Sequence, residues 1–376
     1  MKNERRPYGS LGLLCMRGTE RLAAQIDEYL GQLDIADEGD GHSVLVEYDC
    51  PRFATGEGKG LILQTVRGCD LYILADMFNH GVTYKMFGKD VPMGPDNHYQ
   101  DLKRIIAATN GKARRINLIM PLLYEGRQDR RSARESLDCA LMLQELVHMG
   151  VENIITFDAH DARVQNAIPL SGFENIRPSY QMIRTLLREN KDLVIDSDHM
   201  MVVSPDEGGM PRSILYASMM GLDLGMCYKR RDYSSIVEGR NPILSHEFLG
   251  GDLDGRDVIL VDDIIASGES ILNVAEILKA RGAGRIFIFV TFGQFTRGLE
   301  TYDRAYADGL VHSVYTTNLI YQTEELLSRP WYHSVNMSKY LAHIINTLNV
   351  DSSISELLDP SARIQRLLAD RRKYRI

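Results

Sequence analysis

Long apolar runs are missing from this chain of 376 residues, and cysteine and tryptophan are scarce. No apolar segment approaches the roughly 18 residues that span a bilayer, so we expect no membrane helix. The charged N-terminus has no apolar segment behind it, and we therefore expect no secretory signal. The five cysteines form no CxxC pair, which favours free thiols in a cytoplasmic protein over a disulfide or zinc framework.

An excess of basic charge is also missing. The chain has 43 lysines and arginines against 51 aspartates and glutamates, which gives a net charge of −8. This balance argues against general nucleic-acid binding, because such proteins carry a basic surface. The length is sufficient for two domains with sizeable cores.

Strands and helices are predicted to alternate along the chain, which favours parallel sheets. Two alternating sets indicate two similar α/β domains with a boundary near 170–190. The punctuated residues 79–97 predict a loop or an ornament on the first domain, and residues 232–255 predict a long irregular connection. The tail, residues 360–376, predicts a solvated terminal helix. The expected strands are 44–48, 71–74, 116–120, 154–157, 201–203, 224–228, 258–261 and 286–291, and the expected helices include 21–30 and, after a capping box, 133–149.

The most informative segment extends from Val258 to Ser270. Apolar residues predict a buried strand, Asp262 and Asp263 follow, and a small-residue turn opens a helix. Free backbone N–H groups and the positive end of the helix dipole then point at one spot, which makes an anion site. The two carboxylates can accept hydrogen bonds from vicinal sugar hydroxyls or hold Mg²⁺. The segment therefore predicts a site for a ligand with a diol and a phosphate, such as a ribose 5-phosphate.

Charged side chains follow other predicted strands. The arginines between Arg127 and Arg131 suit a polyphosphate, because guanidinium groups match phosphate oxygens, although a solvated basic turn is the simpler alternative. Asp158 and His160 lie two apart at another strand end, where they point to the same side and can hold a hydrated Mg²⁺.

Two further strand ends are predicted at the same sheet edge. Asp206 precedes a pair of glycines that allow a ligand close to the backbone, and the basic run Lys229–Arg231 closes the next strand. In parallel α/β sheets, ligands bind at the carboxyl ends of the strands. Solvated acidic turns and a solvated charge run are the alternatives for these two segments.

In this order the segments resemble the ribose-phosphate diphosphokinases, which have two tandem type I phosphoribosyltransferase-like domains. The resemblance extends from about Leu13 to about Leu358, and it includes Arg52–Glu57 as an adenine-side loop. It implies an N-terminal domain at 1–178, completed by helices in 333–376, and a C-terminal domain at 179–332. It also implies transfer of diphosphate from ATP to the C1 hydroxyl of ribose 5-phosphate, with Mg²⁺ as the cofactor, in a homo-oligomer built from dimers, up to a hexamer.

The resemblance also implies a role for each matching residue. ATP would be bound by Phe53, Glu57 (from the neighbouring subunit), Arg127 and Gln128, and the magnesium and diphosphate region would be served by Asp158, His160 and Asp206. Charge on the moving diphosphate would be stabilised by Lys229 and Arg231, the ribose hydroxyls would be bound by Asp262 and Asp263, and the 5-phosphate would be held by Ala266, Ser267, Gly268 and Ser270.

The chain departs from the family pattern in several places, and three of the departures lie at expected binding residues. Ala266 and Thr55 each stand where aspartate is usual, and Glu269 stands where glycine is usual. An acid beside a phosphate site is unfavourable unless it points away. The departures leave open a non-catalytic or regulatory paralogue. The loop at 258–270 by itself also permits a phosphoribosyltransferase, and a relative with altered nucleotide or sugar-phosphate preference is a further alternative.

Overall fold

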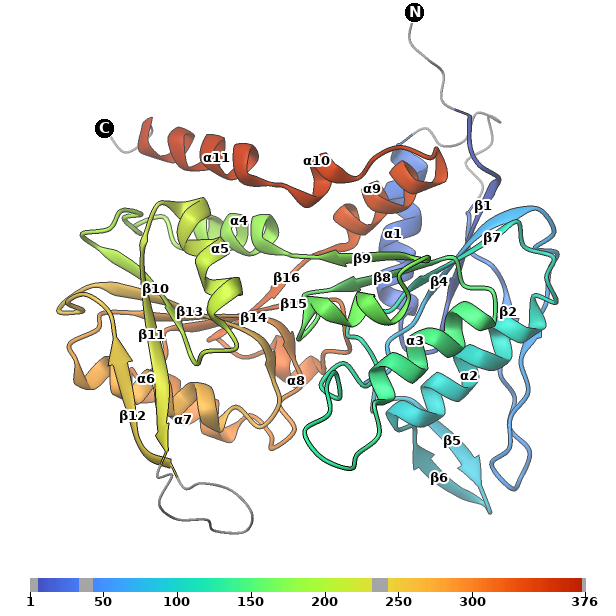
Figure 1. Ribbon diagram of the computed structural model, residues 1–376, viewed down its shortest axis with the longest axis horizontal. Helices are drawn as coiled ribbons and strands as arrows, with labels where there is room; N and C mark the ends of the chain where they lie inside the picture. Colours follow the sequence, from blue (N-terminus) through green and yellow to red (C-terminus); the bar gives the residue numbers. More distant parts are fainter. Residues whose placement is uncertain (1–5, 34–42, 232–242, 374–376) are drawn as a thin grey trace, which may run out of the picture. The chain divides into compact units, whose positions relative to one another are not determined.

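A computed structural model describes residues 6–33, 43–231 and 243–373 (Figure 1). The chain forms two compact units, and each is described by itself. The first unit comprises Met1–Arg177, Asn318–Tyr321 and Asn336–Leu358, and the second comprises Pro178–Thr317, Gln322–Val335 and Asp359–Ile376. None of the helices in the described ranges has the length and apolar character needed to cross a membrane.

The first unit is built on a sheet whose strands are all parallel. Its strands in spatial order are β1 (Ser10–Cys15), β4 (Cys69–Leu74), β7 (Arg115–Ile119), β8 (Asn153–Phe157) and β9 (Gly172–Ile176). Its long helices are α1 (Glu20–Gln32), α2 (Pro95–Ala108), α3 (Asp138–His148) and α9 (Ser338–Asn349), with the short α10 (Ser355–Leu358) and the 3-10 helix η1 (Ala162–Ala167). Helices α2 and α3 cover one face and α1 and α9 the other, so the central strands are buried on both sides (Figure 1).

Residues 79–97 form an ornament with regular structure. Strands β5 (Thr83–Met86) and β6 (Lys89–Pro92) make an antiparallel hairpin, and α2 begins directly behind it at Pro95. The hairpin turn has Phe87 and Gly88 at φ values of 48° and 75°, the left-handed conformations that a tight two-residue turn requires.

Two sequence expectations for the first unit were wrong in detail. The expected strand 44–48 is an isolated bridge at Leu45 followed by the short β2 (Tyr48–Asp49), which pairs with β3 (Leu61–Ile62). The helix expected from residue 133 begins only at Asp138. The backbone N–H of Ser132 does donate to the Glu135 carboxylate at 2.6 Å, but this contact closes a local turn rather than a helix.

The second unit has a larger sheet in which only the β11–β12 pairing is antiparallel within the described strands. Its strands in spatial order are β12 (Ile243–Leu249), β11 (Asp223–Arg231), β10 (Met200–Ser204), β13 (Asp257–Ile265), β14 (Ile286–Gly293), β15 (Ser313–Thr317) and β16 (Tyr332–Val335). Its helices are α4 (Ser179–Glu189), α5 (Met210–Met220), α6 (Glu269–Ala280), α7 (Glu300–Ala307), α8 (Glu324–Leu327) and α11 (Ser361–Lys373). The two units confirm an α/β fold with mainly parallel sheets flanked by helices.

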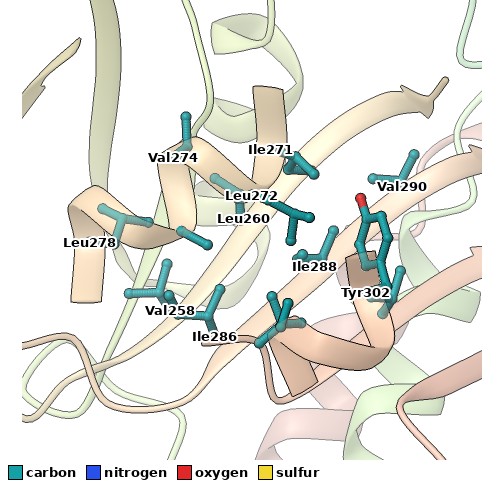
Figure 2. Packing of buried hydrophobic residues seen from close by; sticks show 14 of the residues in the cluster. Val258, Leu260, Ile271, Leu272, Val274, Leu278, Ile286, Ile288, Val290 and Tyr302 are labelled. Atoms are coloured by element: carbon teal, nitrogen blue, oxygen red, sulfur yellow. The ribbon is translucent and has the colours of Figure 1, made fainter. Parts of the chain in front are cut away.

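Helix α6 is held on the sheet by an apolar stripe at helical spacing. Ile271, Val274 and Leu278 are buried in one apolar cluster with the β13 residues Val258 and Leu260 (Figure 2). Helix α7 covers the same face, and α4 and α5 cover the opposite one (Figure 1). This packing fixes where α6 begins, at the carboxyl end of β13.

Part of the expected irregular connection 232–255 is regular, because residues 243–249 form the edge strand β12. Residues 232–242 lie outside the described residues. The C-terminal segment also differs from the expectation that 333–376 completes the first domain. Only 336–358 belongs to the first unit, and α11 packs on α4 and α5 of the second unit, where Gln365 donates to the Met219 carbonyl at 2.9 Å.

A buried ion pair fastens α9 to the first sheet. Asp70 is fully buried and accepts hydrogen bonds from Arg115 at 2.7 and 2.8 Å, from Asn117 at 2.8 Å and from Asn349 of α9 at 2.9 Å. The carboxylate is therefore well supplied with donors, as a charge in a core must be.

Candidate active site

The acid pair lies inside β13 rather than after it, because the strand continues to Ile265. Asp263 is buried, with 6% of its surface exposed, and Asp262 is partly exposed. Arg212 of α5 faces both. Its two terminal nitrogens lie 3.7 Å from Asp262 Oδ1 and 3.7 Å from Asp263 Oδ2.

Arg212 is not among the site residues that the sequence pattern predicts. A signal was present, since the arginine is the one charged residue of this helix and lies on its buried face, where 5% of its surface is exposed. A buried guanidinium needs a negative partner. The acid pair on the neighbouring β13 supplies it.

The electrostatics of the pair favour a ligand rich in hydrogen-bond donors or positive charge. Burial, and after it the neighbouring charge of Asp263, hold the pKa of Asp262 well above its usual range, and Arg212 opposes both effects. Two adjacent carboxylates in one partly buried place resist being charged together. Vicinal hydroxyl groups or a cation would relieve this repulsion.

The turn that follows is shaped by Gly268. This residue caps α6 with φ 85°, and a Cβ atom placed there would lie 2.5 Å from a ring carbon of Tyr302. Only glycine fits both the conformation and the space. The first N–H groups of α6, beside Ser267 and Ser270, lack partners within the helix and make an anion site.

A second loop supports this turn from behind. The N–H of Gln294 donates to the Ile265 carbonyl at 2.8 Å, and the N–H of Thr296 donates to the Ala266 carbonyl at 2.9 Å. Residue 266 makes this contact through its backbone carbonyl and not through its side chain. Alanine in place of the usual aspartate therefore leaves the turn intact.

Asp206 lies at the carboxyl end of β10, which neighbours β13 in the sheet. Its carboxylate accepts from the Gly209 N–H at 3.1 Å, so the loop folds around the acid. Lys229 and Arg231 lie on β11, the next strand beyond β10. Their backbone is described, but their side chains lie outside the described part of the chain.

In the first unit, the loop expected on the adenine side is a tight turn that begins at Phe53. The Phe53 N–H donates to the Glu57 carbonyl at 2.7 Å, and the Gly56 N–H donates to the Phe53 carbonyl at 2.8 Å. The Phe53 ring is 56% exposed, which is unusual for a phenylalanine and leaves its faces open to stacking. Thr55, a departure from the family pattern, donates to the Glu57 carboxylate at 2.9 Å.

The β5–β6 hairpin braces this loop. The Phe87 N–H donates to the Ala54 carbonyl at 2.8 Å, and Arg52 stacks on the Tyr84 ring while binding Asp101 at 2.6 Å. The sequence pattern indicates an ornament in this segment but not a support for the loop. A bracing contact between residues 33 positions apart has no local sequence signal.

Arg127 and the pair Asp158 and His160 follow the neighbouring strands β7 and β8, so the structure places these segments at one edge of the first sheet. Arg127 and His160 are exposed. Gln128 donates from its amide to the Ser136 carbonyl at 3.0 Å, which shapes the loop.

Asp158 has a partner of its own. It is buried, has φ 43°, and forms an ion pair with Arg177 at 2.8 Å. Among the described residues, no group of three or more histidine, cysteine, aspartate or glutamate side chains gathers as a metal centre. Separate carboxylates nevertheless fit Mg²⁺, which is commonly bound by one or two carboxylates together with substrate phosphates.

Known proteins resemble this chain over most of its length. Residues 11–150 match the N-terminal domain of ribose phosphate pyrophosphokinase, and residues 169–315 match a phosphoribosyl transferase domain. A ribose-phosphate pyrophosphokinase of Ralstonia nicotianae is 30% identical over 271 residues, 72% of this chain and 76% of that protein. One of Parasynechococcus marenigrum is 29% identical over 339 residues, 89% of this chain and 90% of that protein.

A solved structure has the same fold. The phosphoribosylpyrophosphate synthetase of Mycobacterium smegmatis aligns with a TM-score of 0.73 at 24% identity, covering 91% of this chain and 100% of that chain.

Proposed function

The chain belongs to the ribose-phosphate pyrophosphokinase family, and on that premise we propose that it transfers the diphosphate of ATP to the C1 hydroxyl of ribose 5-phosphate. The products are 5-phosphoribosyl diphosphate and AMP. The observation that carries this proposal is the continuous arrangement on β13, where an acid pair leads directly into a glycine turn and the start of α6. A diol and a phosphate separated by a pentose ring match that order of groups.

The second unit would bind the sugar phosphate. Asp262 and Asp263 would accept hydrogen bonds from the ribose hydroxyls, with Arg212 balancing their charge. The phosphate would lie on the N–H groups of the turn, at the positions of Ala266, Ser267, Gly268 and Ser270.

The first unit would bind ATP. Phe53 would stack on adenine, Glu57 would contact the base from the neighbouring subunit, and Arg127 and Gln128 would bind the nucleotide. The exposed Phe53 ring and the exposed Arg127 side chain support these roles. The sharing of Glu57 implies a homo-oligomer built from dimers, up to a hexamer, which light scattering of the purified protein tests.

Transfer requires the C1 hydroxyl oxygen to bond to the β-phosphorus of ATP while the bond from that phosphorus to the α-phosphate oxygen breaks. The hydroxyl proton is released to water, and AMP leaves with the bridging oxygen. Such a step gains most from positioning and from positive charge around the phosphates. Lys229 and Arg231 would supply that charge. Asp158 and His160 of the first unit, and Asp206 of the second, would each serve the magnesium and diphosphate region, where Mg²⁺ would neutralise charge on the polyphosphate. The ion pair of Asp158 with Arg177 means that this carboxylate is shared with a cation already present.

The proposal is tested by incubating the protein with ATP, Mg²⁺ and ribose 5-phosphate. We expect AMP and 5-phosphoribosyl diphosphate in equal amounts, and we expect Lys229→Ala to abolish turnover without abolishing binding of ribose 5-phosphate. Formation of ADP, or of no nucleotide product, would overturn the proposal. Release of diphosphate on adding a nucleobase to 5-phosphoribosyl diphosphate would indicate a phosphoribosyltransferase instead.

We also propose a cytoplasmic location. All five cysteines are free thiols, and three of them, Cys50, Cys139 and Cys227, are buried. Such thiols persist in a reducing compartment.

A further inference from the structure

Two opposite charges stand beside the turn that begins α6. Glu269 is the first residue of the helix, and its carboxylate forms an ion pair with Arg297, which lies 28 residues later on the loop after β14. That loop is fixed to the turn by backbone hydrogen bonds, including the one from Thr296 to Ala266. Arg297 is therefore held next to the turn by its backbone as well as by Glu269.

The Glu269 carboxylate is unfavourable beside a bound phosphate and favourable when the site is empty. With no phosphate bound, Glu269 interacts favourably with the positive end of the α6 dipole and with Arg297. A phosphate dianion on the turn would repel Glu269 and attract Arg297. The pair is exposed, with 65% of the Arg297 side chain and 58% of the Glu269 side chain accessible, so the guanidinium can exchange partners at little cost.

The turn also carries a buried polar group with an unmet hydrogen bond. The Tyr302 hydroxyl is buried and has no hydrogen-bond partner among the described residues. Its oxygen lies 2.7 Å from the position that a Cβ of residue 268 would take, directly against the turn. An unsatisfied hydroxyl at this depth is costly and usually marks a place where a ligand or an ordered water completes the site.

We propose that Arg297 is an additional phosphate-binding residue of the sugar-phosphate site, and that Glu269 forms an ion pair with it while no phosphate is bound. This inference rests on the proposed function, because it assigns the phosphate to the turn of α6. On phosphate binding, Arg297 leaves Glu269 and pairs with the phosphate oxygens, for which its planar donors are suited. Glu269 therefore competes with the phosphate for Arg297, and this competition lowers the affinity for the phosphate.

The test measures the affinity of the full-length protein for ribose 5-phosphate, in the presence of Mg²⁺, by isothermal titration calorimetry. Arg297→Gln should weaken binding roughly tenfold, the loss expected for one charge-assisted hydrogen-bonding group. Glu269→Gln should tighten binding several-fold. Arg188→Gln, which removes an arginine of similar exposure paired with Glu189 in the same unit, should leave the affinity unchanged.

The double variant separates exchange from simple neutralisation. If Arg297 moves from Glu269 to the phosphate, Arg297→Gln costs more affinity in the Glu269→Gln background than in the wild type. If Arg297 only cancels the charge of Glu269, its loss costs less in that background, and the inference is overturned. An Arg297→Gln protein that binds as tightly as the wild type also overturns it. A wild-type protein that binds no ribose 5-phosphate refutes the proposed function instead, so the two failures are distinguishable.

Discussion

Replacing Gly268 with alanine should damage sugar-phosphate binding far more than it damages the fold. The glycine has φ 85°, a conformation that costs an alanine about 1–2 kcal/mol. The added Cβ would also lie 2.5 Å from the ring of the buried Tyr302, and overpacking of this kind costs about 1–3 kcal/mol. The turn is expected to escape these costs by moving, which takes the free N–H groups of α6 away from the phosphate.

If restoring the turn for binding costs about 2 kcal/mol of this strain, the affinity for ribose 5-phosphate falls roughly thirty-fold. Calorimetric titration measures this loss, and thermal unfolding measures the effect on the fold. Gly221→Ala is the matched control. Gly221 ends α5 with φ 67° and has open space where the Cβ would go, so the variant has the backbone strain without the clash and away from the turn. Unchanged affinity in Gly268→Ala, or an equal loss in Gly221→Ala, would refute the argument.

Two stability predictions concern the first unit. Burial raises the pKa of Asp76 to about 6 from 3.8. The free energy of unfolding should therefore be highest below about pH 4, where Asp76 is protonated in both states, and should fall by about 3 kcal/mol as the pH rises through 6. Asp76→Asn should remove this pH dependence of the free energy of unfolding in urea, and an unchanged slope would contradict the assignment. Asp70→Asn should destabilise the unit by about 3–5 kcal/mol, because Arg115 loses its buried counter-charge and keeps only the exposed Asp351. Asp351→Asn, which removes the exposed partner of the same Arg115, should cost about 0–1 kcal/mol in the same urea measurement.

The fold could be predicted from the sequence wherever burial controlled the pattern. Strands β4, β7, β8, β10 and β13 are nearly continuous apolar runs, because helices cover both faces of each sheet. Prediction failed where local and tertiary signals disagreed. The capping box at Ser132 forms its hydrogen bond, but no apolar face follows until Asp138, so the helix begins there. The edge strand β12 was missed because its pairing partner β11 lies across residues 232–242.

The candidate site was predictable to the extent that parallel strands end at one edge of a sheet. That rule places the Arg127 loop and Asp158 on neighbouring strands, and Asp206 beside the acid pair. It gives no information about side chains that reach the site from helices. Arg212 enters from α5, and its role depends on which face of that helix is buried.

The effect of a departure from the family pattern also depends on contacts that the sequence does not reveal, and Glu269 is an example. Judged by position alone, Glu269 argues against a phosphate at this turn, because an acid and a phosphate repel each other. Its partner Arg297 lies at the end of the next parallel strand, and no local spacing connects the two. A substitution at a site built from backbone N–H groups therefore has to be judged by the charge that the fold brings to it. At this turn the fold places Arg297 beside the acid, so the negative charge of Glu269 is not by itself an argument against phosphate binding.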